Sequence, residues 1–223
     1  MERIRRIVRH ILEAAVASNQ AASQGLALYR KGTGVSVVYV LYNPAKLMEE
    51  LPKWQDAGGD IASVIYGYLD VRPHKGDCWN AAEIKFSAAQ KGYGPLMYEL
   101  AMSDFENGLF PDRLSTSGAA RNVWKKYAQR TDVGKKPFDD AKNPKTPPKG
   151  DDCKLIPDFD GEEAYLNQAY VGRGDASGKN QMMQLHKDSV ETIASKLGLP
   201  SQEVVQAIYS MGDEYFGSRY RDG

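Results

Sequence analysis

A short turn at residues 90–95, which reads QKGYGP, is the stretch of the sequence best suited to hold a ligand. Gly92 and Gly94 flank a tyrosine, and Pro95 stands where an apolar helical pattern begins. The first N–H groups of a helix have no partner within the helix, and the helix dipole favours negative charge there. Glycines let the backbone approach a ligand closely, and proline is tolerated in the first turn. The turn therefore predicts a phosphate-binding site, to which Lys91 would add a positive charge.

Predicted strands and helices place this turn at a junction between a strand and a helix. β-Branched and aromatic residues indicate strands, and apolar residues at helical spacing indicate helices. The expected elements are strands at 35–42, 61–71 and 79–88 and helices at 95–105 and 117–130. Asn43 is also the expected cap of a helix that begins at Pro44. The order of strand, glycine turn and helix is the arrangement that a phosphate site requires.

These elements predict an α+β fold with a mixed, mostly antiparallel sheet flanked by helices. The sequence divides into a basic amphipathic helix at 1–30, a core at 31–131, an irregular wrapping segment at 132–180 and a C-terminal helical hairpin at 181–223. The wrapping segment is dense in Pro, Lys and Asp and shows neither helical nor strand periodicity. The residues expected to be buried are Val37, Val38, Val40, Val64, Ile65, Ile84, Phe86, Leu96, Leu100 and Val123.

The composition excludes several classes of protein. The 223 residues include 29 Lys+Arg and 29 Asp+Glu, so no charge excess indicates a nucleic-acid partner. No apolar run approaches the roughly 20 residues of a transmembrane helix. Two cysteines and three histidines are too few for a disulfide scaffold or a zinc site. They favour a reducing compartment, so we expect a cytoplasmic location and no bound metal.

The predicted C-terminal hairpin raises the alternative of DNA binding. Ala194, Gly198 and Val204 stand where a helix-turn-helix has its small residue, its turn glycine and a packing residue. A DNA-reading helix needs basic or amide side chains at its start, whereas this one opens SQEVVQAI without Lys or Arg. A packing hairpin is the preferred interpretation.

The run AEIKFSAAQKGYGPLMYELAMS, residues 82–103, resembles the core of the GCN5-related N-acetyltransferases, the GNAT family. In that family the fourth strand leads into a loop of pattern R/Q-x-x-G-x-G/A and then a helix, and the loop amides hold the pyrophosphate of acetyl-coenzyme A (acetyl-CoA). The two small positions match, whereas the basic or amide position falls on Ala89. The resemblance implies a GNAT-like fold and acetyl-CoA as cofactor. The implied cofactor-binding residues are Gln90, Lys91, Gly92, Tyr93 and Gly94.

The run STSGAARNVWKKYAQR, residues 115–130, resembles the last core helix of the same family, which often reads A-x-x-L-Y. The family's tyrosine there commonly protonates the departing thiolate. Its position holds Trp124, and an indole cannot donate this proton. Tyr127, one turn along, and Tyr93 are the implied replacements. The resemblance covers residues 35–130 and makes 31–131 an acetyltransferase-like core.

An acyltransferase also needs a base that removes a proton from the acceptor amine. The resemblance implies Glu83, because family members often carry such a base beside the cofactor turn. Asp77 and His74 are the alternatives. Strand alternation, however, places Glu83, Lys85 and Ser87 on one face of the strand and Ile84, Phe86 and Ala88 on the other, which equally suits a solvent-facing Glu83.

The segment GYGPLMYE, followed by GLFPDR, also resembles a group of uncharacterised tailed-phage proteins with this core. That resemblance implies a phage-encoded protein in the host cytoplasm or packaged in the virion. Ile11-Leu12-Glu13 resembles the site at which a prohead protease cuts a targeting peptide. A packaged chain would then begin at Ala14.

Three functions follow from these patterns. The first is an acyl-CoA-dependent N-acyltransferase. The second is a catalytically silent fold of the same kind that binds other phage or host proteins, which Ala89 and Trp124 favour. The third, a nucleic-acid binder, has the least support. No sequence feature identifies the acceptor.

Overall fold

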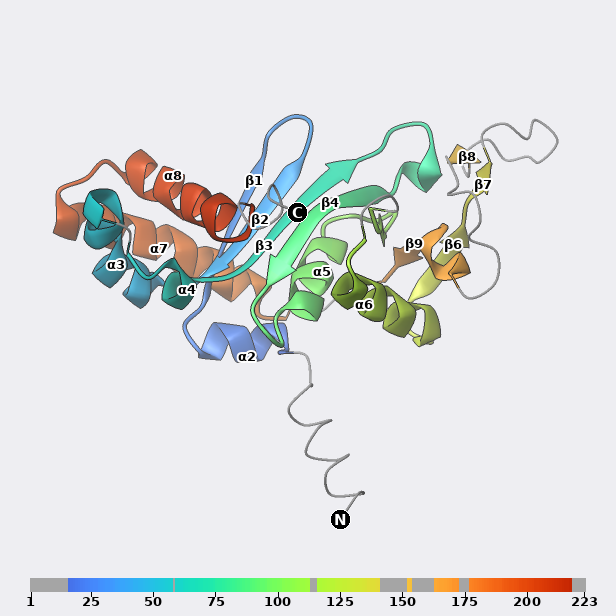
Figure 1. The fold of residues 1–223 in the computed structure, drawn as a ribbon, viewed down its shortest axis with the longest axis horizontal. Coiled ribbons are helices and arrows are strands. Elements are labelled where there is room, and N and C mark those ends of the chain that lie inside the picture. Colours follow the sequence, from blue (N-terminus) through green and yellow to red (C-terminus); the bar gives the residue numbers. More distant parts are fainter. Residues whose placement is uncertain are drawn as a thin grey trace, which may run out of the picture.

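A computed structural model of the chain describes residues 16–57, 59–112, 116–140, 152–153, 163–172 and 177–217. In this part of the chain, seven strands form one sheet in the order β1-β2-β3-β4-β5-β9-β6 (Figure 1). The strands are β1 (Ala27–Gly32), β2 (Val37–Tyr42), β3 (Ile65–Pro73), β4 (Ala82–Ala89), β5 (Leu109–Phe110), β9 (Gln168–Val171) and β6 (Gly134–Pro137). Neighbouring strands are antiparallel except for β4 and β5, which confirms the predicted mixed, mostly antiparallel sheet.

Helices cover both faces of the sheet. The α-helices are α2 (Ser18–Ser23), α3 (Pro44–Ala57), α4 (Ile61–Val64), α5 (Gly94–Met102), α6 (Gly118–Gln129), α7 (Lys179–Leu197) and α8 (Ser201–Gly212). Shorter elements are the 3₁₀ turns η1 (Cys78–Asn80) and η3 (Ala164–Leu166), the π-helical turn η4 (Asp213–Gly217), and the strand pair β7 (Asp139–Asp140) and β8 (Asp152–Cys153). One hydrophobic core joins α2, α5 and α6 to the sheet, and a second joins α3, α7 and α8 to its other face.

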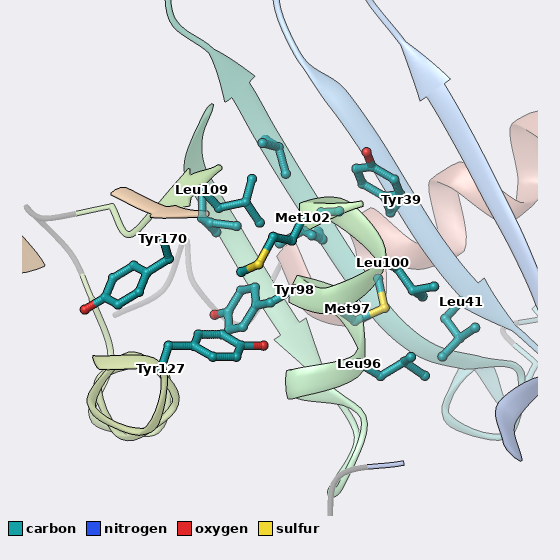
Figure 2. Close-up of a cluster of buried hydrophobic side chains, with 14 of the residues drawn as sticks. Tyr39, Leu41, Leu96, Met97, Tyr98, Leu100, Met102, Leu109, Tyr127 and Tyr170 are labelled. Atoms are coloured by element: carbon teal, nitrogen blue, oxygen red, sulfur yellow. The ribbon is translucent and has the colours of Figure 1, made fainter. Parts of the chain in front are cut away.

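The helix α5 forms the centre of the first core. Six of its nine residues are buried, so it packs on nearly every side rather than along one stripe. Figure 2 shows its side chains filling the space between the sheet and α6, with Tyr98 of α5 beside Tyr127 of α6. These two rings lie 6.4 Å apart. The helix that follows the glycine turn is therefore held rigidly from both sides.

The boundaries expected from composition differ from the observed elements. The segment at 132–180 contributes β6 and β9 to the sheet, and β1 begins within the expected N-terminal segment at 1–30. The four residues of β6, GKKP, carry no strand pattern and are ordered by pairing with β9. Residues 181–223 contain most of the helical hairpin α7–α8, with Gly198 in the left-handed conformation between the helices. The expected cleavage motif at Ile11–Glu13 lies outside the described residues.

The predicted strand at 61–71 begins four residues too early. Residues 61–64 form α4 instead, because the side chain of Asp60 accepts a hydrogen bond from the N–H of Ser63 and caps a helical turn. The strand β3 starts only at Ile65.

The two cysteines form a disulfide, which the expectation of a reducing compartment did not include. Cys78 in η1 is bonded to Cys153 in β8 across 75 residues of sequence. The turn at Cys78 is unusual, since Cys78, Trp79 and Asn80 have φ values of 47°, 58° and 53°. Consecutive non-glycine residues rarely adopt this left-handed conformation. The disulfide therefore links β8 to the strained turn at Cys78–Asn80.

A β-bulge at Lys85 overturns the predicted alternation of β4. Ile84 is paired with Val71 and Phe86 with Asp70, so no residue of β3 lies opposite Lys85. Because of this extra residue, the side chains that follow it in β4 point to the opposite faces of the sheet from those that strict alternation predicts. Ile84 and Ser87 consequently both face α5, whereas Phe86 faces the second core.

Candidate functional site

The sheet opens on one side of β4. Although β4 has eight residues, it pairs with β5 only at Ala82 and Glu83. Beyond Glu83, no strand of the described chain lies on that side, and α5 and α6 flank the free edge instead. The unpaired edge of β4 therefore faces a gap.

Two adjoining cavities fill this gap and together form a groove along β4. The larger, which we call the arm cavity, has a volume of about 320 Å³ and extends from Ser87 to Gly94 at the start of α5. The smaller, which we call the head cavity, has a volume of about 130 Å³ and lies at the Lys85 end. Both cavities share Ser87, Tyr98, Ser117 and Ala120. The groove thus runs continuously from the glycine turn to the bulge.

The two cavities differ in polarity. Small or apolar residues dominate the lining of the arm cavity, among them Ala88, Ala89, Met97 and Val123. Phe216 of η4 also lines it, although this ring belongs to the core on the other face of the sheet. The head cavity is lined instead by charged and hydroxyl-bearing residues, considered below.

A pair of hydroxyl groups marks the junction of the two cavities. The oxygens of Ser87 and Tyr98 lie 2.6 Å apart, a short hydrogen bond. The ring of Tyr98 stacks on Trp124 at a centroid distance of 5.1 Å, which fixes its orientation. Sequence patterns do not reveal Tyr98, because it stands within the apolar helix pattern like any core residue.

The expected proton donor Tyr127 lies away from the groove. It lines neither cavity, and its ring packs against Tyr98 and Trp124 instead. Its hydroxyl donates to the carbonyl of Pro95 at 3.3 Å. Burial raises the pKa of Tyr127 well above its ordinary value. The structure therefore brings Tyr98, rather than Tyr127, to the position where a proton donor could act.

The expected base Glu83 belongs to a line of charged groups beyond the head cavity. His74 bonds Asp77 through Nδ1 at 3.1 Å and Glu83 through Nε2 at 3.3 Å. Lys85 lies 3.4 Å from Glu83 and 3.8 Å from Asp112. Burial alone would raise the pKa of Glu83, but His74 and Lys85 outweigh it and lower that pKa. A carboxylate with a lowered pKa is a weak base, and Glu83 lines neither cavity.

His74 is expected to make stability depend on pH. The hydrogen bond to Glu83, with help from Asp77, raises the pKa of His74 although burial opposes it. Because the pKa of His74 is higher in the folded state than in the unfolded state, protonated His74 stabilises the fold. This stabilisation is complete below the unfolded-state pKa of about 6.5, and it is lost as the pH rises through the folded-state pKa. Urea unfolding at about pH 5.5 and about pH 8.5 should show a larger loss of stability in the wild type than in His74→Gln. Equal losses would contradict this role.

The glycine turn offers fewer free amides than the sequence predicts. The side chain of Gln90 donates to the carbonyls of Ala62 at 2.6 Å and Ile65 at 2.8 Å, and its N–H donates to Tyr66. The N–H of Tyr93 donates to the carbonyl of Gln90. Gln90 and Tyr93 therefore hold the turn together rather than facing a ligand.

Three amides of the turn have no backbone partner in the described part of the chain. The N–H groups of Lys91, Gly92 and Gly94 donate to no backbone carbonyl among the described residues. Gly92 has a φ of 92°, which glycine adopts without strain. Gly94 lines the arm cavity, and a Cβ atom placed on it would meet no atom within 4 Å. Together with the exposed Lys91, these amides can receive an anionic group at the start of α5.

No protein family model, curated protein or solved structure matches this chain. Among the described residues, no helix combines the length and the apolar character that crossing a bilayer requires.

Proposed function

We propose that the groove binds an acyl-CoA thioester, acetyl-CoA in the first instance, and that the chain transfers its acyl group to an amine. The observation that carries the proposal is the separation of β4 from β5 after two residue pairs. The strand edge left open beside the arm cavity offers hydrogen-bonding groups to a narrow ligand that contains amides. The pantetheine arm of coenzyme A is such a ligand.

The two ends of the groove suit the two ends of that ligand. The amides of Gly92 and Gly94 and the charge of Lys91 would receive the pyrophosphate. The hydroxyl pair of Tyr98 and Ser87 would lie beside the thioester, where a proton is needed on the departing sulfur. The order of β4, glycine turn and α5 agrees with the GNAT resemblance, which supports the same assignment.

Two variants of Gly94 test the proposal. Since the space beside Gly94 is open, Gly94→Ala should fold and bind acetyl-CoA as the wild type does, whereas the indole of Gly94→Trp should occupy the arm cavity. We expect the wild type to bind with a dissociation constant of about 1 μM to 1 mM and Gly94→Trp to bind roughly tenfold or more weakly. Calorimetric titration measures both.

The competing proposal is a silent fold that binds no coenzyme. The hydrogen bonds that occupy Gln90 and Tyr93 and the burial of Tyr127 favour it. The same titration decides, because absence of heat with the wild type at millimolar acetyl-CoA would reject coenzyme binding.

A further inference from the structure

The turn between β3 and β4 brings donor atoms for a metal ion together. One ligand atom from each of His74, Asp77 and Cys78 lies within 4.8 Å of the other two. His74 Nδ1 and Asp77 Oδ1 are 3.1 Å apart. Cys153 of β8 adds a fourth donor, because its sulfur is bonded to that of Cys78. Two sulfurs, one nitrogen and one oxygen therefore meet at one place.

This set of donors suits Zn²⁺ once the disulfide is reduced. Zinc in structural sites takes four ligands in a tetrahedron, which thiolates, imidazoles and carboxylates can provide. Bond lengths of about 2.0–2.3 Å place neighbouring ligand atoms about 3.3–3.8 Å apart. The separation of 3.1 Å between His74 and Asp77 is close to this spacing. The two sulfurs must first lose their covalent bond, because zinc is bound by thiolates and not by a disulfide.

The surroundings of His74 are those of a histidine that binds a metal. Its Nδ1 faces Asp77, and its Nε2 lies 3.3 Å from Glu83 Oε2. A metal-binding histidine usually donates its other ring N–H to a carboxylate, which fixes the orientation of the ring. Glu83 is only 13% exposed and also lies 3.4 Å from Lys85 Nζ, so its carboxylate is itself held in place. This position gives a role to a residue that lines neither cavity of the groove.

An apolar cluster shields the sulfur side of the site. Cys78 and Cys153 are 2% and 1% exposed, and they pack with Phe110 and other apolar residues. The ring of Phe110 also lies 5.2 Å from that of His74. Such a shell excludes water from a bound ion. The side chain of Asp77 is 52% exposed, so an ion can enter from that side.

We propose that the reduced chain binds Zn²⁺ through Cys78, Cys153, His74 and Asp77, so that a metal ion and a disulfide are alternative cross-links at the same place. A dithiol reduces the disulfide, becomes a disulfide itself and leaves two thiols on the chain. Zn²⁺ then binds both sulfurs as thiolates, and their two protons pass to solvent. Either link joins β8 to the turn between β3 and β4, so this part of the fold is fastened in an oxidising and in a reducing compartment alike. The number of cysteines and histidines did not indicate the site, because its fourth ligand is an aspartate.

Titration of the full wild-type chain with Zn²⁺ tests the proposal without a variant. One sample is reduced with a water-soluble phosphine, one is left oxidised, and both are freed of metal beforehand. Competition with a chromophoric chelator measures the affinity. We expect one Zn²⁺ per reduced chain with a dissociation constant of about 50 nM or lower, and binding to the oxidised chain roughly 100-fold weaker or more. Equal affinities of the two samples would overturn the proposal.

Co²⁺ in place of Zn²⁺ reports which atoms bind the ion. Tetrahedral Co²⁺ absorbs strongly in the visible range, and thiolate ligands add a charge-transfer band in the near ultraviolet. We expect both features in the reduced chain only. Co²⁺ bound without the charge-transfer band would exclude the cysteines as ligands, and the proposal would be wrong.

Stability provides a second readout of the same site. Without metal, the reduced chain should unfold at a lower urea concentration than the oxidised chain. Zn²⁺ should raise the midpoint of the reduced chain, because the ion binds its folded form, and should leave that of the oxidised chain unchanged. A reduced chain that gains no stability from Zn²⁺ would contradict a metal cross-link.

Variants test the set of ligands. His74→Gln and Asp77→Asn each remove one ligand and should weaken Zn²⁺ binding by the reduced chain about 100-fold or more, whereas Glu83→Gln removes only the hydrogen bond that orients the imidazole and should weaken it about tenfold, with the charge-transfer band of Co²⁺ retained. Asp56→Asn, on the exposed side of α3, should change nothing. If His74→Gln and Asp77→Asn bind Zn²⁺ as the wild type does, the cysteines bind it without them, and the proposed set of ligands is wrong.

Discussion

Replacing Tyr98 by Phe is expected to lower kcat for acyl transfer about 100-fold, the size of effect typical of a lost proton donor. The substitution removes only the hydroxyl that bonds Ser87 at the junction of the two cavities. The ring still stacks on Trp124, so the groove keeps its shape. The affinity for acetyl-CoA should therefore stay the same. Steady-state kinetics with a simple amine such as propylamine as the acceptor measures kcat, and calorimetric titration measures the affinity for acetyl-CoA.

Tyr127→Phe is the matched control for this prediction. It removes a hydroxyl that donates to the carbonyl of Pro95 outside both cavities. We expect its kcat to stay within about twofold of the wild type. If Tyr127→Phe loses activity and Tyr98→Phe does not, the proton comes from the helix that the GNAT resemblance implies, and our assignment of Tyr98 is wrong.

Removing the disulfide in Cys78→Ser/Cys153→Ser is expected to lower the free energy of unfolding by about 4 kcal/mol. The bridge joins residues separated by 75 positions, and a cross-link of that span restricts the unfolded chain strongly. It also fastens the turn in which three successive residues have positive φ. Urea unfolding of the variant and the wild type measures the difference.

Reduction of the wild type provides an independent check on this prediction. Dithiothreitol should shift the unfolding midpoint of the wild type towards that of the double variant and should leave the variant unchanged. A wild type whose midpoint is insensitive to reduction would show that the bridge does not stabilise the fold. Because Asp77 precedes the strained turn and bonds His74, loss of the bridge should also reduce the pH dependence that His74 confers.

The parts of the fold that were predictable from the sequence are those with local signals. The cap at Asn43 is confirmed, since its side-chain oxygen accepts from the N–H of Lys46 at 3.1 Å. The helices expected at 95–105 and 117–130 correspond to α5 and α6. Of the residues expected to be buried, Val37, Phe86 and Val123 are half-buried and the others are buried. Capping residues and apolar spacing act over one or two turns, and a sequence displays them directly.

The features that shape the candidate site depend instead on distant partners. The bulge at Lys85 exists only in relation to β3, and no pattern within AEIKFSAA marks it. The strand β9 is inserted between β5 and β6 from a segment without strand periodicity. The bond between Cys78 and Cys153 is likewise set by long-range packing. Tyr98 was missed for the same reason, because the groove that makes it relevant appears only when β4 and β5 separate.

That separation has a mechanical consequence. The sheet consists of two parts, strands β1 to β4 and strands β5, β9 and β6. Only two residue pairs, between β4 and β5, join these parts. Two residue pairs hold neighbouring strands together much less firmly than a full ladder of hydrogen bonds does. The two halves of the sheet are therefore held together mainly by side-chain packing, since the first hydrophobic core contains residues of β1 to β4 as well as of β5, β9, α5 and α6. The width of the groove consequently depends on this core more than on backbone hydrogen bonds.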